Sequence, residues 1–396
     1  MEVKKIISNT KGDRVIWGVV IVLSLISLMA VYSATGTLAY KKNQANQYYL
    51  VKQLIYLLLG LGIVFFAHRF RYTIYSRWSI ILFAISIPLL IYTLFFGTTL
   101  NEGSRWITLP GVGITFQTSD LAKLGLFMFL ARQLSKLQDD LDNFKKVFLH
   151  IFAPVLVICS LIAIANLSTA LMIAMSCSVL FFIGRVRIKH ILFLGISSML
   201  LFGLLFTASY YGGWGRAETW VQRLKDFSSK EKTDQPYQVV QAKIAIAKGG
   251  LIGKGPGNSS QRNFLPHPYS DFIYAIIIEE YGLILGGGGL MFLYLLFLWR
   301  SILIFRRCPY AFGAFLAVGL SFTLVFQAFI NMAVNVSLFP VTGLTLPLVS
   351  MGGSSILFTC VAIGIVLSVS RFVEEMEGDG NYVVQDDSIN KEYSQA

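Results

Sequence analysis

Three carboxylates lie close together in the segment FLPHPYSDFIYAIIIEEYG, which spans residues 264–282. Asp271 stands at the start of an apolar stretch, and Glu279 and Glu280 follow eight and nine residues later. Ionisable groups inside a bilayer are costly and mostly functional. A carboxylate at a helix start is favoured in its ionised form, which can accept a proton from a hydroxyl group. Asp271 is therefore a candidate general base, and the alternative is that Ser270 or Asp271 only caps the helix.

Glu279 and Glu280 raise a separate question of burial. On one continuous helix they would lie about 12 Å beyond Asp271. A lipid-facing position is untenable for a carboxylate, so we expect at least one of them to face the bundle interior and to find a donor. A structural buried pair is the favoured interpretation of these two residues.

A second pair of charges occurs in NEGSRWITLPGVGITFQTSDLAKL, residues 101–124. Asp120 and Lys123 are three residues apart, so they share one helix face and can pair. They form either a charge-neutral structural pair or the polar wall of a cavity, and both interpretations stay open. Arg105 precedes an expected β-turn around Pro110.

Two further segments are rich in glycine. IAKGGLIGKGPGNSSQ, residues 246–261, carries Lys248 and Lys254, but it does not fit the phosphate-binding pattern G-x-x-x-x-G-K-[ST], and a flexible loop is the alternative. NVSLFPVTGLTLPLVSMGGSSIL, residues 335–357, is interrupted by proline and glycine. Irregular backbone at membrane depth survives only where protein or a water-filled cavity satisfies it. Together with Asp271, this segment predicts the second wall of a pocket.

Composition indicates what kind of protein positions these groups. The chain has 396 residues, of which 55% are hydrophobic and 14% are charged, whereas about a quarter of a soluble protein is charged. The net charge is +12, but the basic residues gather beside apolar blocks, which disfavours nucleic-acid binding. The four cysteines are far apart, and no metal cluster can be recognised in the sequence.

The apolar blocks predict an all-α polytopic membrane protein with ten transmembrane helices. The ranges are 15–34, 51–67, 76–97, 119–134, 147–165, 167–184, 188–209, 271–298, 311–334 and 346–370. Residues 210–270 form a long loop that is not apolar enough to cross, and loops of this length are usually functional.

Lysine and arginine in the short connections predict the orientation of these helices. They gather in residues 1–14 and in every second connection after it. Both termini are therefore expected in the cytoplasm and the 210–270 loop on the opposite, extracytoplasmic side. The acidic tail, residues 372–396, is expected to be disordered.

The segments FQTSDLAKL, FLPHPYSDFIY and GLTLPLVSMGGSS, in this order and spacing, resemble the SEDS family of FtsW, RodA and SpoVE. The resemblance covers residues 15–371 and implies an inverting glycosyltransferase of the bacterial inner membrane. Such an enzyme polymerises lipid II into glycan strands and releases undecaprenyl diphosphate. The resemblance places the catalytic aspartate at Asp271. It gives a supporting polar cavity at Asp120, Lys123, Glu279 and Glu280.

The substrate and its charged leaving group need binding partners. The expected substrate-binding residues are Arg105, Lys243, Lys254, Gln261 and Ser354. A divalent cation, Mg²⁺ or Mn²⁺, is a further candidate. The chain departs from the family pattern at His267 and Tyr269, which replace a glutamate and a histidine, and at Asn166, which replaces an acidic residue. Roles that depend on those family side chains do not transfer.

The motif GLTLP resembles FtsW and SpoVE more than RodA, and the segment KGDRVIW, which leads into the first helix, also resembles FtsW. The resemblance then implies work at the division septum, with a class B penicillin-binding transpeptidase and other division proteins as partners. Three alternatives stay open: a RodA-like polymerase for elongation, a lipid II flippase that uses the same cavity, and an inert scaffold in which Asp271 is only a helix cap.

Overall fold

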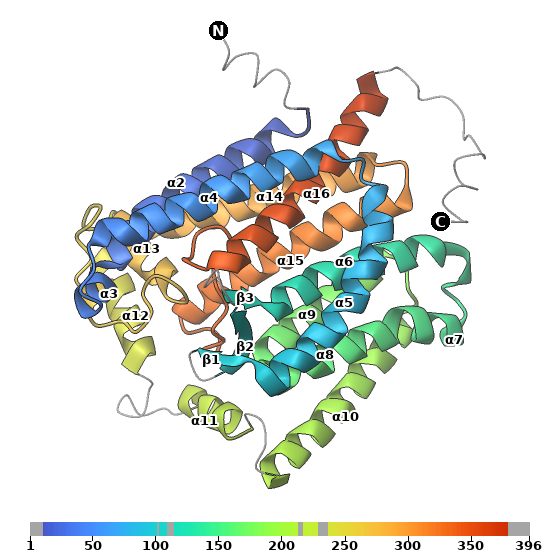
Figure 1. Cartoon of the computed structure of the whole chain (residues 1–396), viewed down its shortest axis with the longest axis horizontal. Coiled ribbons are helices and arrows are strands. Elements are labelled where there is room, and N and C mark those ends of the chain that lie inside the picture. The colour runs from blue at the N-terminus through green and yellow to red at the C-terminus, as the bar shows by residue number, and fades with distance from the viewer. Residues whose placement is uncertain (1–10, 101–102, 109–114, 213–216, 229–236, 379–396) are drawn as a thin grey trace.

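The computed structural model describes residues 11–100, 103–108, 115–212, 217–228 and 237–378, and it is a bundle of helices with one small sheet (Figure 1). The longer helices are α2 (Arg14–Ala34), α4 (Asn46–Arg69), α5 (Ile74–Phe96), α6 (Thr118–Lys136), α8 (Ala153–Ala165), α9 (Leu167–Ile183), α10 (Ile188–Gly212), α14 (Gly289–Arg307), α15 (Ala311–Asn335) and α16 (Gly353–Gly378). The shorter ones are α3 (Gly36–Lys41), α7 (Phe144–Val147), α11 (Ala217–Ser228), α12 (Tyr237–Gly249) and α13 (Ile273–Tyr281). Single turns are η1 (Gln138–Asp140), η2 (Phe148–Phe152), η3 (Gln261–Asn263) and η4 (Gly282–Gly288).

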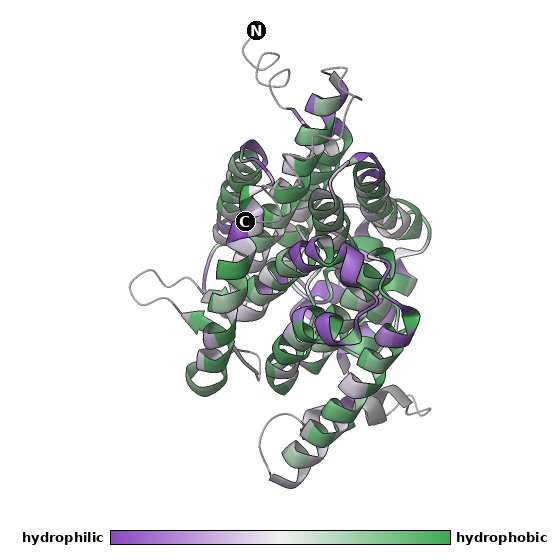
Figure 2. Cartoon of the chain, turned by 90° about the vertical axis from the view of Figure 1, so that its right-hand side faces the viewer, coloured by the Kyte–Doolittle hydropathy of each residue, from purple (hydrophilic) through white to green (hydrophobic). Residues whose placement is uncertain are grey.

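Eight of the described helices are long and apolar enough to cross a membrane, when α7 to α8 and α13 to α14 are each taken as one. Together with the shorter α9 and the charged α6, these make ten long helical segments, the number that was predicted. The fold is therefore that of an all-α polytopic membrane protein. In Figure 2 the rods are mostly hydrophobic, and hydrophilic residues gather in the connections at the end facing the viewer.

The two ends of the bundle differ in their residues. At one end, Arg300 pairs with Asp13 at 2.6 Å and Lys11 pairs with Glu375 at 3.1 Å, so the first and last described segments lie together. We call it the basic end, because the helix termini Arg14, Arg69, Lys136 and Arg307 lie there. The opposite end holds the helix termini Ala34, Thr118, Asn335 and Gly353 together with Asp271, and we call it the Asp271 end.

The core of the bundle is formed by α6, α15 and α16. In the 18-residue apolar stretch of each helix, 78% of the residues are buried in α15 and 72% in α16, against 6% in α10. Close packing requires small residues here, since a Cβ atom at Gly125 of α6 would lie 3.1 Å from the backbone of Leu82 in α5. Figure 1 shows α10 diverging from the other rods toward α11.

A three-stranded antiparallel sheet lies between α5 and α6, and the sequence did not predict its strands. They are β1 (Thr98–Leu100), β2 (Gly103–Thr108) and β3 (Thr115–Gln117), in the order β1-β2-β3. Trp106 faces Gln117 and Thr108 faces Thr115 across the second pair. The turn expected around Pro110 lies outside the described residues.

The predicted eighth helix, 271–298, overlaps the candidate membrane span Ile273–Arg307, but it is not one continuous straight helix. Gly282 adopts φ 77°, which ends α13, and Tyr274 Oη donates to the Gly287 carbonyl at 3.2 Å. On a straight helix these two residues would be about 20 Å apart. The chain therefore turns sharply at Gly282, between α13 and η4. Glu279 and Glu280 lie just before this turn, at the end of α13.

Three other predicted boundaries are corrected. The tenth helix begins at Gly353 instead of residue 346, because residues 343–352 are held as a loop. The same helix extends to Gly378, so the predicted tail boundary at 372 is wrong, and residues 379–396 lie outside the described part. The long loop, predicted to begin at residue 210, begins after Gly212, and it contains α11 and α12.

Candidate functional site

Asp271 lies half-buried just before α13, facing the connection between α15 and α16. Ser270 Oγ donates to Asp271 Oδ1 at 2.9 Å. On the other side, a Cβ atom added at Gly343 would lie 3.6 Å from Asp271 Oδ2. Gly343 has φ +67°, a conformation that favours glycine. The carboxylate therefore has a wall that no side chain can occupy without strain.

The hypothesis that Ser270 or Asp271 is the helix cap is wrong. The N-cap residue of α13 is Phe272. Asn335 of α15 supplies a cap from another helix, because its Oδ1 accepts a hydrogen bond from the Ala275 backbone N–H at 3.1 Å. Asp271 is therefore not the N-cap residue of α13.

Three amide side chains on α15 hold both walls of the site, and they were not among the residues predicted from the sequence. Gln327, Asn331 and Asn335 are spaced by four, so they follow one face of the helix. Asn331 Nδ2 and Asn335 Nδ2 each donate to the Asp271 carbonyl at 2.9 Å. Asn331 also donates to the Leu344 carbonyl at 2.6 Å, and Gln327 donates to the Thr345 carbonyl at 2.9 Å. We call these three residues the amide ladder.

The loop of residues 340–352, predicted as the second wall of a pocket, contacts the segment that carries Asp271. Ser350 Oγ donates to the Ser270 carbonyl at 2.7 Å, and the Met351 N–H donates to the Tyr269 carbonyl at 2.9 Å. One hydroxyl and one backbone N–H of the loop therefore satisfy backbone carbonyls in the segment that carries Asp271.

His267 and Tyr269, where the family pattern is altered, lie beside the site. Tyr269 Oη and His267 Nδ1 are 3.2 Å apart. Burial raises the pKa of Tyr269, and Tyr49 and Asp271 act in the same direction. The phenol therefore keeps its proton at neutral pH and can serve as a donor next to the carboxylate.

Glu279 is bound by the glycine-rich loop, at residues 254–261. It accepts from Lys254 Nζ at 2.7 Å, from Ser259 Oγ at 2.5 Å and from the backbone N–H of Gln261 at 3.2 Å. Ser260 adds two more bonds through its backbone and hydroxyl. The favoured interpretation, a structural buried carboxylate with donors, agrees with this geometry.

Glu280 is also fully buried and structural. Its Oε1 accepts from Ser33 Oγ at the end of α2 and from the Ser259 backbone N–H at 3.3 Å. Its Oε2 has no hydrogen-bond partner among the described residues. Glu279 and Glu280 therefore both accept hydrogen bonds from the glycine-rich loop.

Asp120 and Lys123 pair at 3.6 Å and are both buried, as their spacing predicted. Lys123 Nζ also donates to Gln327 Oε1 at 2.7 Å, which joins the pair to the amide ladder. A cavity of about 20 Å³ beside them is large enough for one water molecule. The pair therefore supports the Thr345 side of the site through Gln327.

The expected substrate-binding residues do not form one cluster. Lys254 and Gln261 are gathered around Glu279. Ser354 is buried at the first turn of α16, where its Oγ accepts from the Gln117 N–H at 3.2 Å. Lys243 is exposed on α12. Arg105 belongs to β2, and its side chain lies outside the described residues.

A divalent cation would need several oxygen ligands. Within the described ranges, no group of three or more His, Cys, Asp or Glu side chains is arranged to hold a metal ion. Those side chains therefore supply no ligand set for the Mg²⁺ or Mn²⁺ ion considered from the sequence.

Comparison with known proteins places the chain in a family. The family model for FtsW, RodA and SpoVE, described as cell cycle protein, matches residues 13–375. Stage V sporulation protein E of Bacillus subtilis is 34% identical over 375 residues, covering 92% of this chain and 98% of that protein. A probable peptidoglycan glycosyltransferase FtsW of Geobacter sp. strain M18 is 32% identical, covering 90% and 96%.

A solved structure gives the same result for the fold. A chain from a peptidoglycan synthase complex, in which polymerization and crosslinking are coordinated, superimposes with a TM-score of 0.70 and 25% identity. The superposition covers 91% of this chain and 98% of that chain. Family model, relatives and fold agree over nearly the whole length, and the chain belongs to the FtsW/RodA/SpoVE family of cell cycle proteins.

Proposed function

We propose that this protein is a peptidoglycan glycosyltransferase that polymerises lipid II into glycan strands, with Asp271 as the general base. The observation that carries the proposal is the placement of Asp271. Its carboxylate lies half-buried beside Gly343, and its carbonyl is fixed by Asn331 and Asn335. A base held so firmly is suited to accept a proton at one defined point.

The reaction is a single displacement at the sugar. Asp271 takes the proton from the 4-hydroxyl of the acceptor GlcNAc, and that oxygen attacks C1 of the donor MurNAc. The bond from C1 to the diphosphate oxygen breaks, undecaprenyl diphosphate leaves, and the configuration at C1 is inverted. The negative charge that develops on the leaving group needs cations nearby.

The cations nominated for the leaving group are not equivalent in their surroundings. Lys254 is held by Glu279 at 2.7 Å, so its charge is already compensated. Arg105, on β2, and Lys243, exposed on α12, are the other candidates for the diphosphate. Tyr269, as a protonated phenol next to Asp271, is a further donor for the sugar.

The proposal also includes a partner and a location. We place the protein in the bacterial inner membrane with both termini cytoplasmic, because the basic connections and both described chain ends share one end of the bundle. FtsW relatives support a role at the division septum, whereas the sporulation relative supports a stage-specific role. The synthase complex supports a class B penicillin-binding transpeptidase as partner, with other division proteins around it.

The test is reconstitution of the purified protein in vesicles with fluorescent lipid II, with and without a class B transpeptidase. We expect a ladder of glycan products on a gel. A lipid II flippase would instead move the labelled lipid between leaflets, and dithionite quenching of an NBD label would reveal that movement. Translocation without any glycan product would contradict the proposed function.

A further inference from the structure

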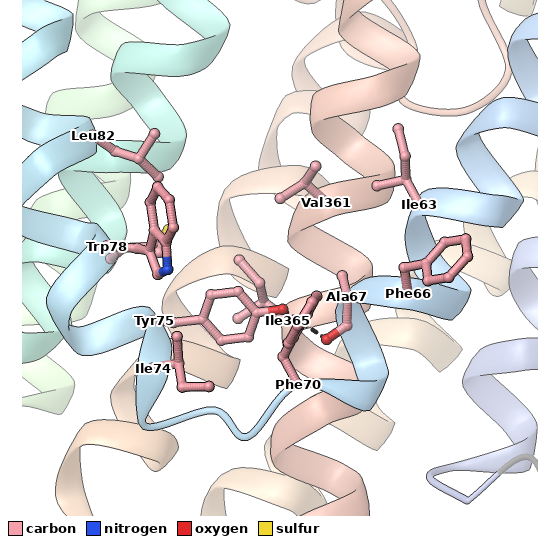
Figure 3. A pocket seen from close by; sticks show the side chains of 11 residues that line it. Ile63, Phe66, Ala67, Phe70, Ile74, Tyr75, Trp78, Leu82, Val361 and Ile365 are labelled. Carbon is pink, nitrogen blue, oxygen red and sulfur yellow. Dashed lines mark hydrogen bonds between the residues drawn. The ribbon is translucent and has the colours of Figure 1, made fainter.

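An apolar groove of about 460 Å³ opens on the side of the bundle between α4 and α5, toward the basic end. Figure 3 shows Trp78 and Leu82 on one wall, Phe66 and Ile63 on the other, and Ile365 of α16 behind them. A phenol in the lining, that of Tyr75, donates to the Ala67 carbonyl at 2.6 Å. The groove therefore presents hydrocarbon and aromatic surface.

The groove is a seam between two packed pairs of helices. On one side α4 packs against α16, and on the other α5 packs against α6. Phe66 and Trp78 at the rim are 66% and 52% exposed, although both belong to membrane-crossing helices. In a bilayer such a surface is covered by hydrocarbon. Lipid acyl chains supply that hydrocarbon, and the lining of the groove is apolar enough to accept one.

Exposed arginines lie next to the basic end of the groove in the chain. Arg71 and Arg77 belong to the same short stretch as the lining residues Phe70 and Trp78, whereas the Arg69 guanidinium lies over the ring of Phe65, outside the groove. Other arginines at this end are neutralised by carboxylates: Arg187 by Asp142, Arg300 by Asp13, Arg307 by Glu377 and Arg371 by Glu375. Arg69, Arg71 and Arg77 form no ion pair with a carboxylate in the part of the chain that the structure describes.

We propose that this groove, together with Arg71 and Arg77, binds an anionic glycerophospholipid from the leaflet at the basic end. One acyl chain occupies the groove, and the phosphate lies near Arg71 and Arg77. Basic pockets between transmembrane helices select anionic headgroups in this way. The site is separate from Asp271, so it does not depend on the proposed catalytic role.

Tryptophan fluorescence can report the occupant directly, because Trp78 lines the groove. The probe is the full-length protein with the five other tryptophans replaced by phenylalanine. It is placed in phosphatidylcholine vesicles that contain an equal mole fraction of either brominated phosphatidylglycerol or brominated phosphatidylcholine. Bromine on an acyl chain quenches a tryptophan that it contacts. We expect stronger quenching of Trp78 by the brominated phosphatidylglycerol.

The matched control is a second single-tryptophan protein that keeps Trp299 of α14. Trp299 is 55% exposed and lies near the same basic end, but it does not line the groove. We expect no comparable preference there. An equal preference at both positions would mean general attraction of anionic lipid to a basic surface, and it would overturn the site.

Removing the positive charges of the arginines gives a second, independent test of the site. Arg71→Gln with Arg77→Gln should lower the phosphatidylglycerol preference at Trp78 by about fivefold for each arginine, the contribution of one cation near an anionic surface. Arg306→Gln, an exposed arginine of α14, should leave it unchanged. If the double variant does not fold, the comparison of Trp78 with Trp299 still decides. An unchanged preference in a folded double variant would contradict the arginine role.

Discussion

Asn331 is the residue that joins the two walls of the site. Its single amide nitrogen donates to the Asp271 carbonyl and to the Leu344 carbonyl. Asn331→Leu would leave the Leu344 carbonyl without this donor and would weaken the hold on Asp271. We expect a loss of about 1–3 kcal/mol in unfolding free energy. Because Asp271 would be less well placed, kcat should fall more than KM rises.

Ser321 provides the control for this prediction. It is a fully buried polar residue of the same helix, and its hydroxyl has no hydrogen-bond partner within the described residues. Ser321→Ala should therefore leave both unfolding temperature and turnover close to those of the parent protein. If Asn331→Leu lowers stability with no change in kcat, the amide ladder is a structural support only.

The stability losses caused by substituting Asp120 and Lys123 should be coupled, and Gln327 should limit how much the double substitution recovers. Removing one partner leaves a buried charge, which costs about 3–5 kcal/mol. Combining Asp120→Asn with Lys123→Met should recover part of that loss in thermal unfolding. Recovery should be incomplete, because Gln327 Oε1 then loses its donor. Simple addition of the two single losses would show that the pair is not coupled.

Among the elements, the turn between α13 and α14 depends on glycine. Gly282 has φ +77°, and a Cβ atom there would overlap the Leu251 carbonyl oxygen. Gly282→Ala should therefore be strongly destabilising and should lower the unfolding temperature. Gly62→Ala in α4 is the matched control, because a Cβ atom added at Gly62 would meet nothing within 4 Å. That change should stabilise by about 0.5–1 kcal/mol through helix propensity.

The ten apolar segments and the break after α13 show what the sequence could and could not predict. The ten rods follow from apolar length, which is a local property. The break in the eighth helix was missed because IYAIIIEEYGLILGGGGLMFL is apolar apart from its two glutamates, while the break depends on contacts of Gly282 with residues 251 and 252. Such contacts connect distant parts of the chain and leave no periodic signal.

The candidate site was predicted in part for the same reason. Asp271 and the 340–352 loop stand out in the sequence, because charge and broken helix are unusual in an apolar chain. The amide ladder also left a signal, since Gln327, Asn331 and Asn335 recur every four residues in an apolar helix. The attachment of Lys254 and Gln261 to Glu279 had no such signal, because it depends on how the glycine-rich loop folds back.

Considered as one body, the molecule has two ends that should face opposite compartments. Gln138, at the basic end, and Asn258, in the glycine-rich loop, are both exposed. In a background without the four native cysteines, Asn258→Cys should react with an impermeant thiol reagent added outside intact cells. Gln138→Cys should react only after the membrane is permeabilised. The reverse pattern would overturn the orientation.

The catalytic role of Asp271 is decided by the glycan yield of Asp271→Asn from fluorescent lipid II, resolved on a gel. Asparagine keeps the size of the side chain and the backbone contacts to Asn331 and Asn335, but it does not accept the proton. Folding is verified by thermal unfolding and by retained binding to the transpeptidase. We predict turnover lower by roughly 10²–10⁴-fold, the usual contribution of a general base. A folded Asp271→Asn protein that polymerises at nearly the parent rate would contradict this role.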